Sequence, residues 1–341
     1  MNPRILIIYT GGTIGMVQRP DDGSLAPVNF EELSNEIPML NKFGYKINAI
    51  TLSPIIDSSN ITPELWFKLA ETIENNYEVY DGFVVLHGTD TMAYTASALS
   101  FMLENLNKPV IFTGSQLPIG TLRTDGKENL LTSIEIAAAV KKGKCIVPEV
   151  CIYFNSKLFR GNRSSKIDSA QFRAFESKNY PPLAKAGVEI NYSCEYIRKA
   201  NNDKRLKVNY KLNTNVVILK IFPGIQPLVV ESIIDIPDLK GIVLESFGSG
   251  NVPEFDWFTQ LINKAINKGI IVVNVSQCAG GKVQMGLYHT SKDIQKVGVV
   301  SGYDMTSEAA ISKIMFLLGQ GYTYNKVIKY LNTNIQGEIS L

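Results

Sequence analysis

Short runs rich in Val and Ile recur along the chain, and segments with helical periodicity separate them. The runs show little alternation of apolar and polar residues, which is typical of strands covered on both faces. This order of strands and helices predicts an α/β protein with parallel sheets and argues against a β-sandwich or a helical bundle. The runs are Ile5–Tyr9, Phe83–His87, Val110–Thr113, Val150–Phe154, Val216–Ile221, Ile242–Glu245 and Ile270–Val275.

Several of the intervening helices have recognisable ends. One is predicted to begin after Thr62, because a threonine cap is followed by Pro63 at the first helical position. A second ends before Gly269, and a third spans Ser307 to about Leu318. A further helix is expected over residues 93–106.

The length of 341 residues suggests about two domains. The polar stretch from Asn191 to Asn215 interrupts the strand–helix rhythm and suits a connector between domains. We therefore expect a larger N-terminal α/β domain over residues 1–190, a connector over 191–215, and a smaller C-terminal α/β domain over 216–341.

Composition excludes several classes of protein. The formal net charge is only +2, so a nucleic-acid partner is not expected. No apolar run approaches the ~20 residues that span a bilayer, and the start of the chain lacks signal-peptide features, which predicts a soluble cytoplasmic protein. The four cysteines show no metal or disulfide spacing. The two histidines, His87 and His289, belong to no zinc motif, and two histidines make most Ser/His/Asp and Cys/His schemes improbable.

Two loops share one design. Thr10-Gly11-Gly12-Thr13-Ile14-Gly15 follows the first predicted strand, and His87-Gly88-Thr89-Asp90-Thr91 follows a later one. Ligands bind beyond the carboxyl ends of parallel strands, so both loops are expected to face one crevice. From either loop alone, helix capping through Thr13 or Asp90 is the favoured explanation, and two threonines at two strand ends point more strongly to a site than one does. A phosphate-binding function is weaker, because neither dinucleotide nor P-loop spacing is present.

Two other segments offer polar chemistry. Lys166 follows the basic run Arg160–Arg163, and desolvation in a cleft favours the neutral form of a lysine, which can accept a proton. A solvated basic loop is the alternative. Asp57-Ser58-Ser59 could bind the ammonium and carboxylate of a small ligand, or could form a hydrogen-bonded turn.

Taken together, these segments resemble the bacterial-type L-asparaginases, in particular the cytoplasmic type I branch. The resemblance rests on the two threonine loops, on Asp57-Ser58-Ser59 and on Arg160–Arg163 ahead of Lys166. It continues through Thr113-Gly114-Ser115-Gln116, Phe222-Pro223-Gly224-Ile225, Gly248-Ser249-Gly250-Asn251 and Gln277-Cys278, and thus covers nearly the whole chain.

The resemblance implies hydrolysis of L-asparagine to L-aspartate and ammonia, with the asparaginase two-domain fold and the threonines in the N-terminal domain. Thr13 matches the nucleophile, and Thr89, Asp90 and Lys166 match the second catalytic cluster. The substrate-binding positions are Asp57, Ser58, Ser59, Gly88, Thr89 and Asp90. No cofactor or metal is implied. The family suggests a homodimer or homotetramer, and some members are allosteric, with Ser165 beside Lys166 as a point where coupling could act.

The sequence departs from the family in the segment after the first loop. Residues 16–30 contain no tyrosine, although many relatives have one there that contacts the nucleophile. Ser24, a water molecule or a tyrosine from elsewhere are the candidates for activating Thr13. Ser59 also stands where the periplasmic branch has glutamine.

Three other functions remain open at this stage. The chain could prefer glutamine, because one methylene changes selectivity by only ~1–3 kcal/mol. It could be an ammonia-donating amidotransferase-type subunit. It could also be a non-catalytic amino-acid-binding module, which the joint presence of Thr89, Asp90 and Lys166 disfavours.

Overall fold

The structure is a computed structural model that describes residues 2–18, 25–27, 37–201, 203–286 and 289–340. The chain separates into two compact units, Met1–Tyr210 and Lys211–Leu341.

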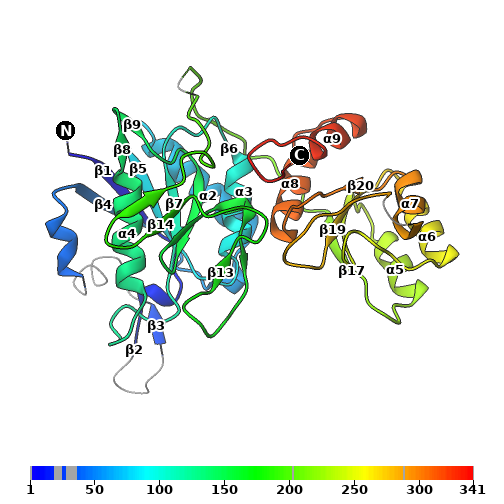
Figure 1. Ribbon diagram of the computed structural model, residues 1–341, viewed down its shortest axis with the longest axis horizontal. Helices are drawn as coiled ribbons and strands as arrows, with labels where there is room; N and C mark the ends of the chain where they lie inside the picture. The colour runs from blue at the N-terminus through cyan, green and yellow to red at the C-terminus, as the bar shows by residue number, and fades with distance from the viewer. Residues whose placement is uncertain (1, 19–24, 28–36, 202, 287–288, 341) are drawn as a thin grey trace. The chain divides into compact units, whose positions relative to one another are not determined.

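Among the described residues of the first unit, eight strands form one sheet in the order β15-β14-β11-β10-β7-β5-β1-β4 (Figure 1). Five of these strands run parallel: β4 (Lys46–Thr51), β1 (Arg4–Tyr9), β5 (Gly82–Leu86), β7 (Val110–Thr113) and β10 (Val150–Phe154). The sheet then continues antiparallel through β11 (Lys157–Arg160), β14 (Ala184–Ala186) and β15 (Ile190–Tyr192). The sheet is therefore mixed, and the parallel prediction holds for its central strands.

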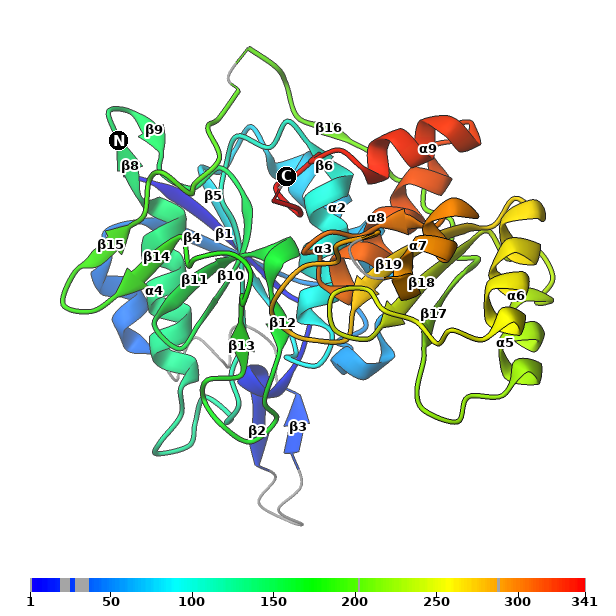
Figure 2. The same cartoon turned by 45° about the vertical axis from the view of Figure 1, so that its right-hand side comes forward.

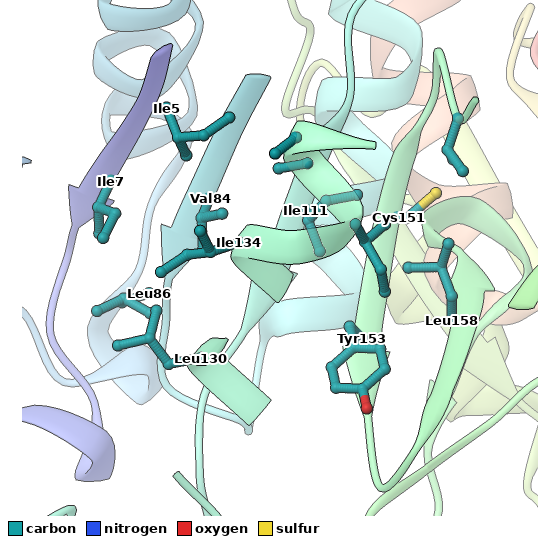
Figure 3. Packing of buried hydrophobic residues seen from close by; sticks show 14 of the residues in the cluster. Ile5, Ile7, Val84, Leu86, Ile111, Leu130, Ile134, Cys151, Tyr153 and Leu158 are labelled. Atoms are coloured by element: carbon teal, nitrogen blue, oxygen red, sulfur yellow. The ribbon is translucent and has the colours of Figure 1, made fainter. Parts of the chain in front are cut away.

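Helices cover the sheet of the first unit. Helix α4 (Gly126–Ala138) places Leu130 and Ile134 against Ile7, Val84 and Leu86 of the central strands (Figure 3). Helices α2 (Pro63–Asn76) and α3 (Met92–Met102) pack against each other, and the indole N–H of Trp66 donates to Thr95 Oγ1 at 3.0 Å. Buried strands of this kind carry continuous apolar sequence because neither face meets water.

The second unit has a smaller, wholly parallel sheet in the order β17-β18-β19-β20. Its strands are β17 (Val216–Lys220), β18 (Gly241–Ser246), β19 (Ile271–Ser276) and β20 (Val300–Ser301). Its helices are α5 (Pro227–Ile234), α6 (Asp256–Asn267), α7 (His289–Lys296), α8 (Ser307–Gly319) and α9 (Tyr324–Leu331). A separate hydrophobic cluster around Val230, Ile242 and Phe258 forms its core.

The first unit also contains short two-stranded pairs and 3-10 turns outside the main sheet. Two-stranded pairs are β2 (Met16–Gln18) with β3 (Leu25–Pro27), β6 (Leu103–Glu104) with β16 (Lys207–Val208), β8 (Val140–Lys141) with β9 (Lys144–Cys145), and β12 (Ser165–Lys166) with β13 (Phe175–Glu176). Single 3-10 turns span Thr13–Gly15, Pro38–Lys42, Ser58–Asn60 and Gly161–Arg163.

Every predicted strand is present, and the three predicted helix ends lie where expected, at Pro63, Asn267 and Ser307. The helix expected over residues 93–106 is shorter and ends at Met102, because Leu103 and Glu104 pair as a strand with Lys207 and Val208. In the described ranges, the helices are all too short or too polar to cross a membrane.

A buried ion pair anchors the end of the chain in the second unit. Lys313 on α8 contacts Glu338 at 2.5 Å, and both side chains are fully buried. Lys313 also donates to the carbonyl of Thr333 at 2.8 Å, while Glu338 accepts from the backbone N–H of Gln336 at 2.7 Å. Burial lowers the pKa of Lys313. Glu338 opposes this shift, so the two charges depend on each other. Removing one of them leaves the other buried without a counter-charge.

We expect Lys313→Met to lower the free energy of unfolding by about 3–5 kcal/mol, because it leaves the Glu338 carboxylate buried without a cation. The double variant Lys313→Met/Glu338→Gln should recover a large part of the lost stability, since the amide oxygen at position 338 still accepts from the backbone N–H of Gln336. Urea unfolding measures both. Wild-type stability in Lys313→Met would show that the pair contributes nothing.

Candidate active site

The two glycine-containing loops meet at the carboxyl ends of β1 and β5. These strands are neighbours in register, with Tyr9 opposite Leu86, and the backbone N–H of Thr10 continues the pairing by donating to Leu86 at 3.0 Å. Beyond this point Gly12, with φ of 92°, approaches Gly88 so closely that a Cβ on Gly12 would lie 2.5 Å from the backbone nitrogen of Gly88. Only glycine fits this contact. The two loops therefore lie against each other at this edge of the sheet.

Neither loop uses its threonine or aspartate as a helix cap. Thr13 is the first residue of a 3-10 turn whose capping residue is Gly12, and no side-chain cap bond is present. Helix α3 is preceded by Thr91, whose hydroxyl instead donates to the carbonyl of Ser58 at 2.7 Å. The capping explanation for Thr13 and Asp90 is therefore not supported by the structure.

Lys166 joins the second loop from a distant part of the sequence. Its Nζ lies 2.8 Å from Thr89 Oγ1 and 2.7 Å from Asp90 Oδ1. Its side chain is 17% exposed, whereas that of Asp90 is 61% exposed. Lys166 belongs to the β12–β13 pair, so backbone pairing with Phe175 fixes its position. The lysine is thus held in place, and the carboxylate stays open to a ligand; the solvated-loop alternative does not describe Lys166.

Gln116 is a polar neighbour of Thr89 to which the sequence assigned no role. Thr89 Oγ1 donates to Gln116 Oε1 at 3.4 Å, and the Gln116 amide donates to the carbonyl of Gln171 at 3.0 Å. The Asp125 carboxylate accepts from the backbone N–H of Gln116 at 3.1 Å. The position after the predicted strand Val110–Thr113 was the available signal, because that strand also ends at this edge of the sheet.

Asp57, Ser58 and Ser59 form a hydrogen-bonded turn beside the same loops. Asp57 Oδ1 accepts from both the N–H and the hydroxyl of Ser59, each at 2.8 Å, and these bonds, the backbone one first, lower the pKa of Asp57. Ser58 is buried, and a Cβ on Gly88 would lie 2.5 Å from Ser58 Oγ. The turn therefore brings this segment against the second glycine loop.

Two aromatic side chains near the loops are unsuited to act as bases. His87 is fully buried between the carbonyl of Gly88 at 2.7 Å and Thr95 Oγ1 at 3.0 Å, and desolvation lowers its pKa to about 4. Tyr9 donates to the carbonyl of Gly15 at 3.1 Å, and burial raises its pKa to about 12. Ser24, the other named candidate for activating Thr13, lies outside the described residues.

The glycine loops, threonine hydroxyls and lysine–aspartate pair define a site suited to nucleophilic chemistry on a small amide or ester. Among the residues that the structure describes, no group of three or more potential metal ligands occurs. Family models match both parts of the chain: "Asparaginase, N-terminal" over residues 4–198 and "Glutaminase/Asparaginase C-terminal domain" over residues 215–331. The chain belongs to the asparaginase family.

Individual relatives are similar over almost the whole chain. L-asparaginase 1 of Escherichia coli K12 is 42% identical, with 98% of each chain covered. A 60 kDa lysophospholipase of Mus musculus is 41% identical over 99% of this chain, which spans only 63% of the mouse protein's length. The crystal structure of L-asparaginase I from Vibrio cholerae superposes with a TM-score of 0.90 at 39% identity and covers 100% of both chains. The family predicted from the sequence is confirmed.

Proposed function

We propose that this protein hydrolyses L-asparagine to L-aspartate and ammonia through an ester on Thr13. The contact of Lys166 Nζ with both Thr89 Oγ1 and Asp90 Oδ1, in a loop that touches the Thr13 loop, is the observation that carries the proposal. Similarity to proteins named L-asparaginase supports the choice of substrate.

In the first step, Thr13 Oγ attacks the side-chain amide carbon of asparagine. The C–N bond breaks, the hydroxyl proton passes to the leaving nitrogen, and ammonia departs from a β-aspartyl ester on Thr13. Backbone N–H groups of the two glycine loops stabilise the oxyanion, and the loss of one such donor typically costs ~3 kcal/mol. The close Gly12–Gly88 contact keeps these donors fixed before the substrate arrives.

In the second step, water attacks the ester and releases L-aspartate. In the structure Lys166 donates to Thr89 Oγ1 at 2.8 Å and pairs with Asp90, so Lys166 first releases a proton to solvent. Its amine then receives the Thr89 proton as Thr89 takes one from the attacking water. The proton held by Lys166 returns through Thr89 to the Thr13 oxygen as the ester C–O bond breaks, which restores both groups. Gln116 Oε1 accepts a hydrogen bond from Thr89 Oγ1 at 3.4 Å, and this contact positions the Thr89 hydroxyl beside Lys166.

The remaining groups hold the two ends of the substrate. Asp90, open to solvent and paired with Lys166 on one side, binds the substrate ammonium. The turn Asp57-Ser58-Ser59 borders the same loops and, with the backbone of Gly88, binds the α-carboxylate and ammonium. These roles follow the family resemblance residue by residue.

Ammonia release from L-asparagine and L-glutamine, measured across a saturation series, tests the proposal. We expect kcat/KM for asparagine to exceed that for glutamine by about 10-fold or more, because a pocket distinguishes one methylene by ~1–3 kcal/mol. A higher value for glutamine would favour the glutaminase or ammonia-donating alternative. Release from neither amide would leave an amino-acid-binding module. The shape of the asparagine curve reports cooperativity.

We also propose a cytoplasmic homodimer or homotetramer. The type I resemblance supports both, and the four free cysteines fit a reducing compartment. The mass of the purified protein in light scattering tests the assembly, and a monomer at micromolar concentration would contradict it.

A further inference from the structure

A basic cavity lies at the amino end of the sheet in the first unit. It has a volume of about 880 Å³, and its lining includes Arg4, Lys46, Asp81, Lys108 and Lys144. Arg4 and Lys46 begin the adjacent parallel strands β1 and β4, while Asp81 and Lys108 precede β5 and β7. The glycine loops follow the opposite ends of β1 and β5, about 20 Å away along a six-residue strand.

The charges lining this cavity are unbalanced. Asp81 is the carboxylate among the lining side chains, and it already accepts from the backbone N–H of Arg4 at 2.8 Å, with the guanidinium at 3.9 Å. Lys46 and Lys144 are exposed and form no ion pair with any residue that the structure describes. Cationic groups gathered in a concave surface reinforce one another's field and attract anions.

Hydrogen bonds and a ring contact hold Lys108 at the floor of the cavity. The Lys108 ammonium donates to the carbonyls of Tyr77 and Tyr80, the latter at 2.8 Å, and lies 4.7 Å from the centre of the Tyr77 ring. Burial lowers the pKa of Lys108, with Glu78 and Asp81 opposing this shift. The backbone N–H of Asn107 donates to the Tyr77 hydroxyl at 2.8 Å. The half-buried Lys108 ammonium therefore has defined partners, whereas Lys46 and Lys144 are exposed.

The β8–β9 hairpin supplies one wall and lies beside the start of β1 in both views of the molecule (Figures 1 and 2). Its turn, Lys141-Lys142-Gly143-Lys144, is exposed, and Gly143 has φ of 75°. The Cys145 thiol at the base of the hairpin donates to the carbonyl of Asn107 at 3.0 Å, which ties this wall to the floor.

The segment around residue 200 supplies another wall. The side-chain amide of Asn107 donates to the carbonyls of Asn201 at 3.0 Å and Lys204 at 3.1 Å, and Ala200 lines the cavity. One asparagine thus connects the floor, the hairpin and this segment. The hydrogen bonds of Asn107 therefore hold the walls of the cavity in place relative to its floor.

We propose that this cavity binds a small polyvalent anion carrying two or more phosphate or carboxylate groups. The volume lies within the range of ligand pockets, roughly 300–1,000 Å³. Several spaced cations bind a polyvalent anion better than a single charge does, because each forms a charge-assisted hydrogen bond. The formal net charge of the whole chain, +2, does not indicate this local excess of positive charge. The site is separate from the one that we assign to amide hydrolysis.

Isothermal titration calorimetry with inorganic pyrophosphate and with citrate, at constant ionic strength, tests the proposal and separates phosphate from carboxylate ligands. We expect saturable binding of at least one anion with Kd below about 1 mM. The variant Lys46→Gln/Lys144→Gln should weaken that binding at least tenfold. The control Lys185→Gln/Lys292→Gln removes two exposed lysines elsewhere and should bind as the wild type does.

Three results would overturn the proposal: no saturable heat with either anion, unchanged affinity in Lys46→Gln/Lys144→Gln, or equal weakening in the control variant. The last result would indicate general electrostatic attraction. None of these results depends on whether the protein hydrolyses asparagine, so the two proposals stand or fall separately.

Discussion

Replacing Thr13 by Val should abolish asparagine hydrolysis while leaving the protein folded. We expect kcat to fall by a factor on the order of 10⁴ or more, because the hydroxyl that forms the ester is lost and the isosteric valine cannot attack. Stability should change little, since the Thr13 side chain makes no capping bond. Steady-state ammonia release and the melting temperature measure the two effects.

Thr10→Val is the matched control for this variant. Thr10 lies in the same loop, and its buried hydroxyl donates to the carbonyl of Leu86 at 2.9 Å. Its loss should cost about 1 kcal/mol of stability but retain most of the turnover. Substantial turnover by Thr13→Val, or equal loss in both variants, would contradict a nucleophilic role for Thr13.

Lys166→Met should produce the second large effect, a fall in kcat of roughly 10²–10⁴-fold. The amine that receives the proton from Thr89 is removed, so hydrolysis of the ester becomes slow while its formation continues. The melting temperature should change only modestly, because an ion pair with a largely exposed aspartate contributes about 0–1 kcal/mol.

Lys178→Met serves as the control for Lys166. Lys178 also pairs with a carboxylate, Glu176, at 2.7 Å, but it has no contact with Thr89. Its replacement should leave turnover unchanged. If Lys166→Met also turned over at the wild-type rate, the proton relay would have to be abandoned.

The central strands of both sheets could be predicted because they are buried on both faces and carry continuous apolar sequence. The strand Lys46–Thr51 was not predicted, since it lies at the sheet edge, is half exposed and mixes polar with apolar residues. Lys157–Arg160 was missed for another reason. Its Arg160 is buried with Glu149 as an ion-pair partner at 2.6 Å and with the carbonyl of Tyr196 as a further acceptor at 2.8 Å, and such tertiary partners cannot be read from a local pattern.

The candidate site likewise has parts that local sequence predicts and parts that depend on tertiary contacts. The two glycine loops could be located from the strand ends that precede them. Lys166 was a candidate base from its own segment, and the resemblance assigned it to the same site as Thr89, 77 residues away in sequence. The contact of Gln116 with Thr89 could not be predicted, because it depends on two tertiary contacts. Strands β5 and β7 are neighbours, and the Asp125 carboxylate accepts from the backbone N–H of Gln116 and so fixes its position.

Intact-protein mass spectrometry of acid-quenched Lys166→Met tests the ester on Thr13 most directly. Mixed with excess L-asparagine, the variant should release one equivalent of ammonia and gain the mass of one aspartyl residue, which peptide mapping should place on Thr13. Ammonia release from the same sample with Thr13 unmodified would contradict the account.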